Sequence, residues 1–302
     1  MKRRDFLRGL GWGVAVAMLP AALKPGMRPA GAASPLRLAC LSDAHLADGR
    51  ESRPEARALA RAVAEVGALS PRPDLVLFAG DLAAQGDAGA LALGRELLQD
   101  LPAPLLAVRG EGDGHAHGLT GRFLGPGRFS HRLPGLQLVG LDTTLASGPG
   151  GAAFAVGREQ LAWLDGELSR LHPDQPLLVL SHAPLEPLYY PWRQWTLDGP
   201  GLLSRLRRFR RVFCLHGHVH RHGPGHGGRA NRGAGAATSS APRVSGAIRH
   251  HGLLATSWPL PWPLMGTPAR LTPVPGDQGC GWSLLLVADG PFLHLPCRWP
   301  SG

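Results

Sequence analysis

Between residue 35 and about residue 220, short apolar runs alternate with longer amphipathic segments, and this alternation constrains the fold most strongly. The apolar runs span 36–41, 74–80, 104–108, 136–141, 176–181 and 212–215. Leu, Ala and Val recur at the three-to-four spacing of amphipathic helices, with Arg and Glu between them, over 54–69, 88–101 and 157–171. Strands that alternate with helices predict an α/β layered domain. We expect one domain over residues 34–302, with no internal repeat.

Five of these apolar runs are followed by side chains that can bind a metal ion. In chain order these side chains are Asp43 and His45, Asp81, Glu111, His182, and His218 with His220. In open α/β sheets, ligands collect at the carboxyl ends of the strands, so we expect the five points to converge. Packing alone does not explain them, because an unpaired buried carboxylate or imidazole costs several kcal/mol.

The spacing and chemistry of these residues point to two metal ions. In an extended Asp-x-His or His-x-His segment, both side chains lie on the same side, so each pair can face one cluster. A mixture of carboxylates and imidazoles suits Mn, Fe or Zn better than Ca or Cu(I). Seven candidate ligands are more than one tetrahedral ion requires. We therefore expect two divalent or trivalent ions that share a carboxylate.

The order of these groups resembles the calcineurin-like metallophosphoesterases, whose blocks are DxH, GD, GN-H-[DE], a lone His and GHxH. Here the blocks read DAH at 43–45, GD at 80–81, GEGD at 110–113, SH at 181–182 and GHVH at 217–220, within about residues 36–222. The segment GREQLAWLDGEL at 157–168 also resembles the branch that holds cyclic-nucleotide phosphodiesterases. The resemblance implies a four-layer α-β-β-α sandwich.

The resemblance also implies a role for each ligand in a phosphoesterase. Asp43, His45 and His220 would hold one ion, and Asp81 would bridge both. His182, His218 and Glu111 would hold the second ion. A hydroxide between the two ions would then attack the phosphorus of a phosphate mono- or diester in line.

The block at 110–113 departs from the family pattern, which has Asn at position 111 and a proton-donating His at position 112. Glu111 can still bind a metal, and its charge should hold the second ion more firmly while that ion polarises a phosphoryl oxygen less. Gly112 has no side chain, and general acid catalysis typically contributes about 10²- to 10⁴-fold. The sequence therefore predicts a slow enzyme. If the missing His limits the rate, Glu111→Asn combined with Gly112→His is expected to raise turnover, whereas an unchanged or lower rate would mean that another residue already donates the proton. The alternative is a non-catalytic metal-binding protein of the same fold.

Three nearby residues are candidates to replace the missing proton donor. These are Asp113, His115 and His117. Glycines at 110, 112 and 114 allow this loop unusual backbone angles, which could bring one of the three to the leaving group.

The first 33 residues resemble a twin-arginine export signal. Arg3 and Arg4 precede a short, weakly apolar run, and Ala30 and Ala32 fit an A-x-A cleavage site. The run from 9 to 23 is too short for a membrane span and contains Pro20. We expect export to the periplasm by the twin-arginine machinery, with no stable membrane span after cleavage.

Removal of this segment lowers the formal charge of the chain from +10 to +5. Half of the basic excess would thus belong to the export signal. Because aromatic residues are not interleaved with the remaining basic ones, we expect no nucleic-acid partner. The expected partner is a phosphate-ester substrate.

Two features of the C-terminal part complete the sequence expectations. Residues from about 221 to 250 are rich in Gly, His and Arg and predict a flexible loop. The apolar runs on either side of Asp289 and Gly290 predict a hairpin. Cys280 and Cys297 flank this hairpin and could face each other across it. In an oxidising compartment the two residues could form a disulfide or remain free thiols, and the sequence does not decide between these alternatives.

Overall fold

The computed structural model describes residues 34–114, 121, 124–144, 147–148, 151–152, 154–186, 195–220, 243–245, 248–257, 279–288 and 292–299. All but Ser34 belong to one compact unit, Pro35–Gly302. The expected export signal, residues 1–33, lies outside the described part of the chain. None of the described helices is both long enough and apolar enough to cross a bilayer.

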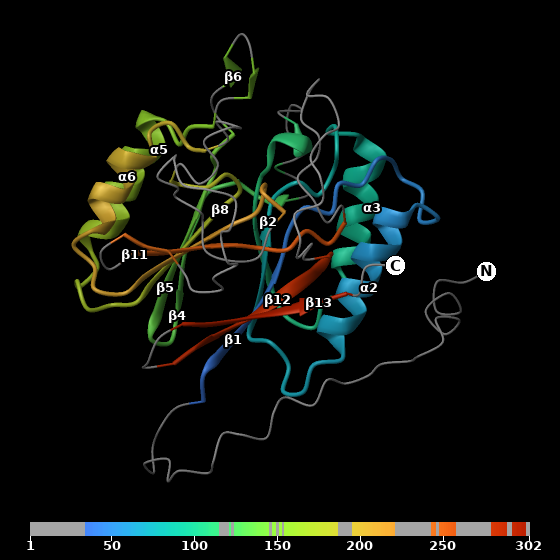
Figure 1. Cartoon of the computed structure of the whole chain (residues 1–302), viewed down its shortest axis with the longest axis horizontal. Coiled ribbons are helices and arrows are strands. Elements are labelled where there is room, and N and C mark those ends of the chain that lie inside the picture. The colour runs from blue at the N-terminus through green and yellow to red at the C-terminus, as the bar shows by residue number, and fades with distance from the viewer. Residues whose placement is uncertain are drawn as a thin grey trace, which may run out of the picture. The chain divides into compact units, whose positions relative to one another are not determined.

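Two mixed sheets form the centre of the unit (Figure 1). The first has the order β13-β12-β1-β2-β3, with strands β1 (Leu36–Leu41), β2 (Leu75–Ala79), β3 (Leu105–Val108), β12 (Gly281–Val287) and β13 (Leu293–Arg298). The second has the order β10-β11-β9-β8-β5-β4. Its strands are β4 (Phe129–Leu133), β5 (Leu136–Leu141), β8 (Leu177–Ser181), β9 (Val212–His216), β10 (Arg243–Ser245) and β11 (Ile248–Gly252). A small hairpin of β6 (Ser147–Gly148) and β7 (Gly151–Ala152) stands apart from both.

Parallel pairing places the carboxyl ends of the central strands at one edge of each sheet. Strands β1, β2 and β3 are parallel neighbours, with Cys40 beside Leu77 and Leu77 beside Leu106. In the second sheet β5, β8, β9 and β11 are parallel neighbours, with Val179 beside Cys214. The segments that carry the predicted metal ligands follow these ends.

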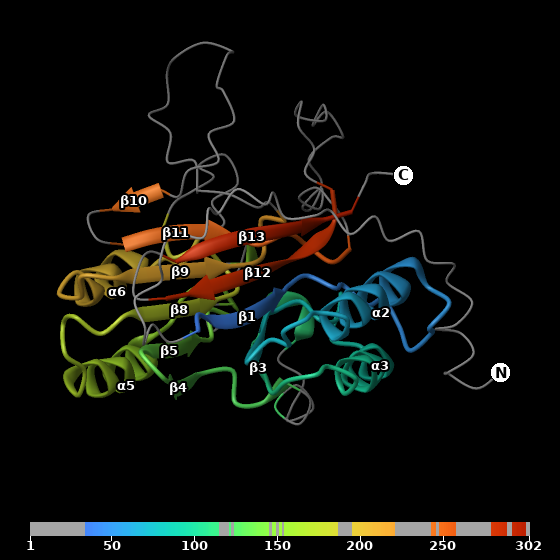
Figure 2. The same ribbon diagram turned by 90° about the horizontal axis from the view of Figure 1, so that it is seen from below.

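Helices cover the outer face of each sheet (Figures 1 and 2). Helices α2 (Pro54–Gly67) and α3 (Ala88–Leu98) lie on one side, and α5 (Arg158–Ser169) and α6 (Gly199–Leu206) lie on the other. Three apolar cores separate the layers: one under α2 and α3, one between the sheets, and one under α5 and α6. The predicted four-layer α-β-β-α sandwich is therefore confirmed.

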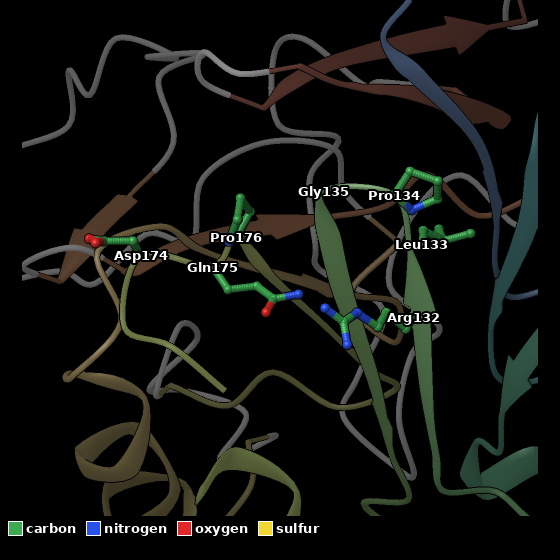
Figure 3. Close-up of a pocket in the computed structure, with 7 residues that line it drawn as sticks. All are labelled: Arg132, Leu133, Pro134, Gly135, Asp174, Gln175 and Pro176. Carbon is green, nitrogen blue, oxygen red and sulfur yellow. The ribbon is translucent and has the colours of Figure 1, made fainter. Parts of the chain in front are cut away.

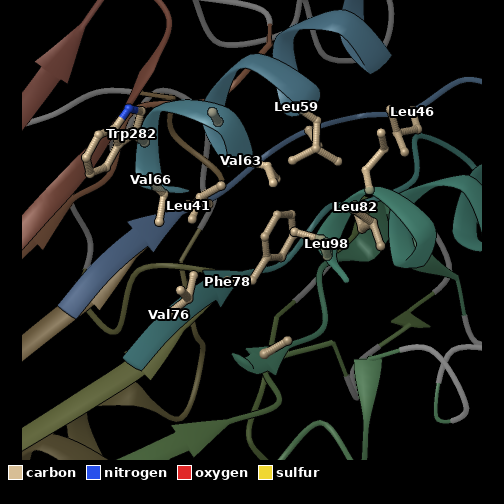
Figure 4. Packing of buried hydrophobic residues seen from close by; sticks show 14 of the residues in the cluster. Leu41, Leu46, Leu59, Val63, Val66, Val76, Phe78, Leu82, Leu98 and Trp282 are labelled. Carbon is tan, nitrogen blue, oxygen red and sulfur yellow. The ribbon is translucent and has the colours of Figure 1, made fainter. Parts of the chain in front are cut away.

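Strand β2 shows how the sequence produces these layers. Every residue of its LVLFA sequence is buried. Val76 and Phe78 face the core under α2 and α3, whereas Leu75 and Leu77 face the core between the sheets. Figure 4 shows Phe78 packed among the buried side chains of the first core. A continuous apolar run, rather than an alternating one, is what a strand buried on both faces requires.

Local signals explain where the helices begin. Pro54 occupies the first turn of α2, where its missing N–H costs nothing. The side chain of Asp87 caps α3 by accepting a hydrogen bond from Ala90 N at 2.8 Å. The three predicted helices are present, each shorter than expected by one to three residues at one or both ends.

The structure differs from expectation at the end of the predicted loop at 221–250. Residues 221–242 of this segment lie outside the described residues, but β10 and β11 occupy 243–245 and 248–252. Strand β11 pairs in parallel with β9, and both His250 and His251 are buried. Pairing with a buried strand outweighs the polar composition from which the loop was predicted.

The predicted hairpin near the C-terminus consists of β12 and β13, which pair antiparallel with Trp282 beside Cys297. All four cysteines are free thiols. Cys280 and Cys297 both pack at the rim of the core under α2 and α3. The disulfide that the sequence allows between Cys280 and Cys297 is therefore not formed in this structure.

Candidate metal centre

The candidate metal ligands lie on tight turns that follow the central strands. Asp43, His45, Asp81, His218 and His220 all have positive φ, between 47° and 62°. Residues other than glycine rarely adopt this left-handed conformation, and it persists only where the surroundings hold it. The clustering of five such residues at one edge marks a site that the fold maintains against local strain.

Hydrogen bonds between and within the sheets hold these turns. Within the first sheet, Asp43 N donates to Gly80 O at 3.0 Å. Across the sheets, His218 N donates to Asp43 Oδ1 at 3.1 Å. His182 Nδ1 donates to Ala79 O at 2.7 Å, because a carbonyl can only accept. This bond fixes the imidazole so that Nε2 is the atom available to a metal.

Asp43, His45 and His220 form the first group of ligands. The two Nε2 atoms of His45 and His220 lie 3.0 Å apart. Asp43 Oδ1 lies 3.3 Å from His220 Nε2 and 3.8 Å from His45 Nε2. Three ligand atoms so close together can bind a single ion.

Glu111, His182 and His218 form the second group. Glu111 Oε2 lies 2.7 Å from His182 Nε2, and Glu111 Oε1 lies 2.8 Å from His218 Nδ1. Neither Glu111 Oε2 nor His182 Nε2 makes a hydrogen bond in the described part of the chain, although both atoms are buried. Buried polar atoms that face one another without a hydrogen bond fit a metal ion as their common partner.

Asp81 lies between the two groups. Its Oδ2 atom is 3.6 Å from His45 Nε2 and 3.5 Å from His182 Nε2. Its Oδ1 atom accepts a hydrogen bond from Gly112 N at 2.7 Å. The structure thus brings all seven predicted ligands together, with Asp81 in the position of a shared ligand.

The pKa shifts at the centre reflect how closely its buried charged groups lie to one another. Burial lowers the pKa of His45 to about 4, so its ring is neutral at physiological pH. Burial and the Glu111 carboxylate raise the pKa of Asp81. Although burial alone would lower it, the pKa of His182 is raised because Asp81 and Glu111 face the ring. Buried carboxylates that repel one another are relieved when cations bind between them.

Asp113 has a different position from the one expected of a proton donor. It is fully buried, and its carboxylate accepts hydrogen bonds from Gly110 N at 2.9 Å, Asp81 N at 3.0 Å and Ala83 N at 2.9 Å. Burial raises its pKa to about 6 against the opposing effect of these N–H groups. Both oxygens hold the turns after β2 and β3, so we assign Asp113 a positioning role. The other two candidates, His115 and His117, lie outside the described residues.

Gly112 fits closely against the turn after β2. A Cβ atom at this position would lie 2.4 Å from Ala83 O and 3.1 Å from Asp81 Oδ1. The carbonyl of Gly112 also accepts a hydrogen bond from Gly86 N at 2.6 Å. There is no space for a side chain here, so the expectation that Glu111→Asn combined with Gly112→His raises turnover is not supported.

The sequence did not reveal Phe154 as part of the centre. Its buried ring meets His218 edge-on, with 4.7 Å between the ring centroids, and lies 6.5 Å from the ring of His182. Its ring therefore packs against two imidazoles of the second group of ligands. No motif identifies this residue, because a single Phe before a helix resembles any core residue.

A separate depression of about 720 Å³ lies away from these ligands (Figure 3). Its lining comes from the β4–β5 turn and from the segment before β8, over 132–135 and 174–176. These residues precede β5 and β8, whereas the candidate ligands follow the strands. The depression is therefore not part of the metal centre.

Comparison with known proteins agrees with this geometry. The family described as calcineurin-like phosphoesterase matches residues 36–222. Among solved structures, a dimetal phosphatase from Danio rerio is similar with a TM-score of 0.58 and 15% identity, covering 87% of this chain and 99% of that one. A purple acid phosphatase from yellow lupin (Lupinus luteus) seeds has a TM-score of 0.56 and 13% identity, covering 88% and 52%. At these identities the structures show the fold alone.

Curated relatives are similar over about half to two thirds of the chain. A probable glycerophosphodiester phosphodiesterase from Arcobacter nitrofigilis is 26% identical over 178 residues, 55% of this chain and 63% of the relative. A cAMP/cGMP dual specificity phosphodiesterase from Mycobacterium tuberculosis is 31% identical over 161 residues, 49% of each protein. A probable cyclic nucleotide phosphodiesterase from Synechococcus is 30% identical over 200 residues, 63% of this chain and 76% of the relative. The chain thus spans less than two thirds of the length of the first two.

Proposed function

Because the chain belongs to the calcineurin-like phosphoesterase family, we propose that it hydrolyses a phosphate mono- or diester at a centre of two metal ions. The observation that carries the proposal is the pair of ligand groups with Asp81 between them, its Oδ2 atom 3.6 Å from His45 Nε2 and 3.5 Å from His182 Nε2. The names of the three relatives above, all phosphodiesterases, favour a diester.

The residues present fit such a centre and divide its tasks. Asp43, His45 and His220 would hold one ion, and Glu111, His182 and His218 would hold the other. When bound, the ions would act as Lewis acids and lower the pKa of water from about 15.7 toward about 7. The hydrogen bond from His182 Nδ1 to Ala79 O and those accepted by Asp113 keep the ligands oriented before any ion binds.

One observation favours a second candidate function, a metal-binding protein without turnover. Gly112 stands where the family has its proton-donating His, and the turn after β2 fills the adjacent space.

The size of the effect nevertheless favours an enzyme over this second candidate. Since general acid catalysis contributes about 10²- to 10⁴-fold to the rate, loss of the proton donor slows hydrolysis without abolishing it. We therefore propose a slow enzyme, active mainly on esters whose leaving group needs little protonation.

Hydrolysis by the purified protein reloaded with Mn²⁺ tests the proposal. The substrates are p-nitrophenyl phosphate and bis(p-nitrophenyl) phosphate, and the control is Asp81→Asn. Asn tolerates the positive φ of 55° at this position, so the variant removes the shared carboxylate without new backbone strain. We expect hydrolysis that the variant loses. Activity equal to that of Asp81→Asn with Mn²⁺, Fe²⁺ and Zn²⁺ would favour the non-catalytic alternative.

We further propose that the chain is exported to the periplasm by the twin-arginine pathway. The support is the sequence of residues 1–33, with Arg3, Arg4 and the small residues Ala30 and Ala32. N-terminal sequencing of the protein recovered from the periplasm checks it. A mature chain that begins near Ser34 is expected, whereas a protein that retains Met1 in the cytoplasm contradicts it.

A further inference from the structure

The two ligand groups of the centre have the same chemical composition. Each contains one carboxylate of its own and two imidazoles: Asp43 with His45 and His220, and Glu111 with His182 and His218. Each also faces the same oxygen of Asp81, at 3.6 Å from His45 and 3.5 Å from His182. The two sites therefore offer their ions the same kinds of ligand, with the Asp81 carboxylate between them.

Glu111 is responsible for this equivalence. With a neutral side chain at position 111, the second group would have only the shared carboxylate of Asp81, while the first would keep Asp43. Glu111 instead places one carboxylate oxygen 2.7 Å from His182 Nε2 and the other 2.8 Å from His218 Nδ1. A carboxylate binds hard divalent ions more strongly than a neutral amide because it adds a full charge at the same distance.

The backbone around Glu111 fixes this arrangement. Glu111 is the first residue of a single 3-10 helical turn, Glu111–Asp113. The turn is held by two hydrogen bonds, from Gly110 N to the Asp113 carboxylate and from Gly112 N to Asp81 Oδ1. Phe154 packs against the ring of His218 on the other side of the group. The second site is therefore formed as completely as the first.

We propose that Glu111 makes the second metal site equivalent to the first, so that two ions of the same kind bind with affinities of the same order. The inference rests on the proposed function only in requiring two ions at this centre. It adds that neither site binds its ion much more weakly than the other, and that the charge of Glu111 is responsible for this similarity.

Calorimetric titration of the metal-free protein with Mn²⁺, with electron paramagnetic resonance of the bound ions, tests the proposal. The wild-type chain is expected to take two equivalents in one unresolved step. Glu111→Gln removes the charge at nearly constant volume, and its titration should split into two steps. The second step should be weaker by at least about tenfold, since even outer-shell substitutions at metal sites cost 10- to 100-fold.

Three further variants control the result. Asp43→Asn should split the titration as Glu111→Gln does, with the other site now weak, and Asn suits the positive φ of 53° at this position. Glu111→Asp keeps the charge and should keep a second ion bound more tightly than Glu111→Gln does, which guards against a general loss of folding. Asp174→Asn changes an exposed carboxylate in the segment before β8, in the depression that lies away from the ligands, and should leave the titration unchanged.

The outcomes separate this inference from the proposed function. Two equivalents bound in well-separated steps by the wild-type chain would overturn the equivalence and leave the two-metal centre intact. An unchanged titration of Glu111→Gln would show that Glu111 does not hold the second ion, and would also overturn it. Failure of the wild-type chain to bind any Mn²⁺ would overturn both.

Discussion

A backbone carbonyl occupies the space beside Gly112. A Cβ atom at this position would come within 2.4 Å of Ala83 O, an atom of the turn that carries Asp81. Gly112 is thus part of the contact that positions the carboxylate of Asp81, which also accepts a hydrogen bond from Gly112 N. Its lack of a side chain is a structural requirement of this chain.

We predict that Gly112→Ala lowers the free energy of unfolding by about 1–3 kcal/mol, the usual cost of overpacking a close contact. Urea denaturation measures the change. Gly166→Ala is the matched control: Gly166 lies on the exposed face of α5 with nothing within 4 Å of an added Cβ, so Ala should stabilise by about 0.5–1 kcal/mol. Equal changes in the free energy of unfolding for the two substitutions would mean that the turn after β2 moves to accommodate the added methyl group, and would contradict the prediction.

At the scale of single residues, the sequence predicted which side chains meet but not how they are held. The spacing of Asp43, His45, Asp81, His218 and His220 was enough to place them in one cluster. Their positive φ angles were not predictable, because any residue other than glycine adopts that region uncommonly and the hydrogen bonds that hold these turns come from other strands. For the same reason the sequence offers Asp113 only as one of three candidate proton donors, although its partners are backbone N–H groups 30 and 32 residues away as well as that of Gly110.

Hydrogen bonds join the start of helix α6 to the segment before α5, which carries Phe154 beside the second ligand group. Asp198, at the start of α6, accepts hydrogen bonds from Val156 N at 2.9 Å and Gly157 N at 2.7 Å. Leu197 N donates to Phe154 O at 2.8 Å, and Thr196 N donates to Pro184 O at 2.8 Å. These bonds fasten Phe154 to the chain that follows His182.

We predict that Asp198→Ala lowers the free energy of unfolding by about 1–3 kcal/mol, because it leaves two backbone N–H groups without their acceptor. Urea denaturation again gives the value. The control is Asp165→Ala, which removes an exposed carboxylate paired with Arg205 and should cost about 0–1 kcal/mol. If Asp198→Ala proves no more costly than the control, the segment does not depend on this carboxylate.

Elements with a strong apolar pattern were predictable, and those that depend on tertiary pairing were not. The continuous apolar sequences of β2 and β8 predicted buried strands, which the structure confirms. Helix α6 was missed because it is only eight residues long and begins with Gly199, Pro200 and Gly201. Strand β11 was missed because His250 and His251 appear polar, whereas pairing with β9 buries both.

At the scale of the whole molecule, the centre lies where the two sheets meet. Asp43 and Asp81 follow strands of the first sheet, and His182, His218 and His220 follow strands of the second. Bonds such as that from His218 N to Asp43 Oδ1 join the sheets at this edge. The order of the ligand blocks predicted this arrangement through the resemblance to a family, because strand and helix alternation alone does not specify that two sheets stack.

The central claim is that this junction holds two metal ions, and metal analysis of the chain purified from the cells that produce it tests this most directly. We predict two equivalents of Mn, Fe or Zn per chain in the wild-type protein. Asp81→Asn should bind fewer, because it loses the carboxylate that both sites share. A wild-type protein that is folded yet carries none of these metals, and takes up none when they are supplied, would contradict a two-metal centre.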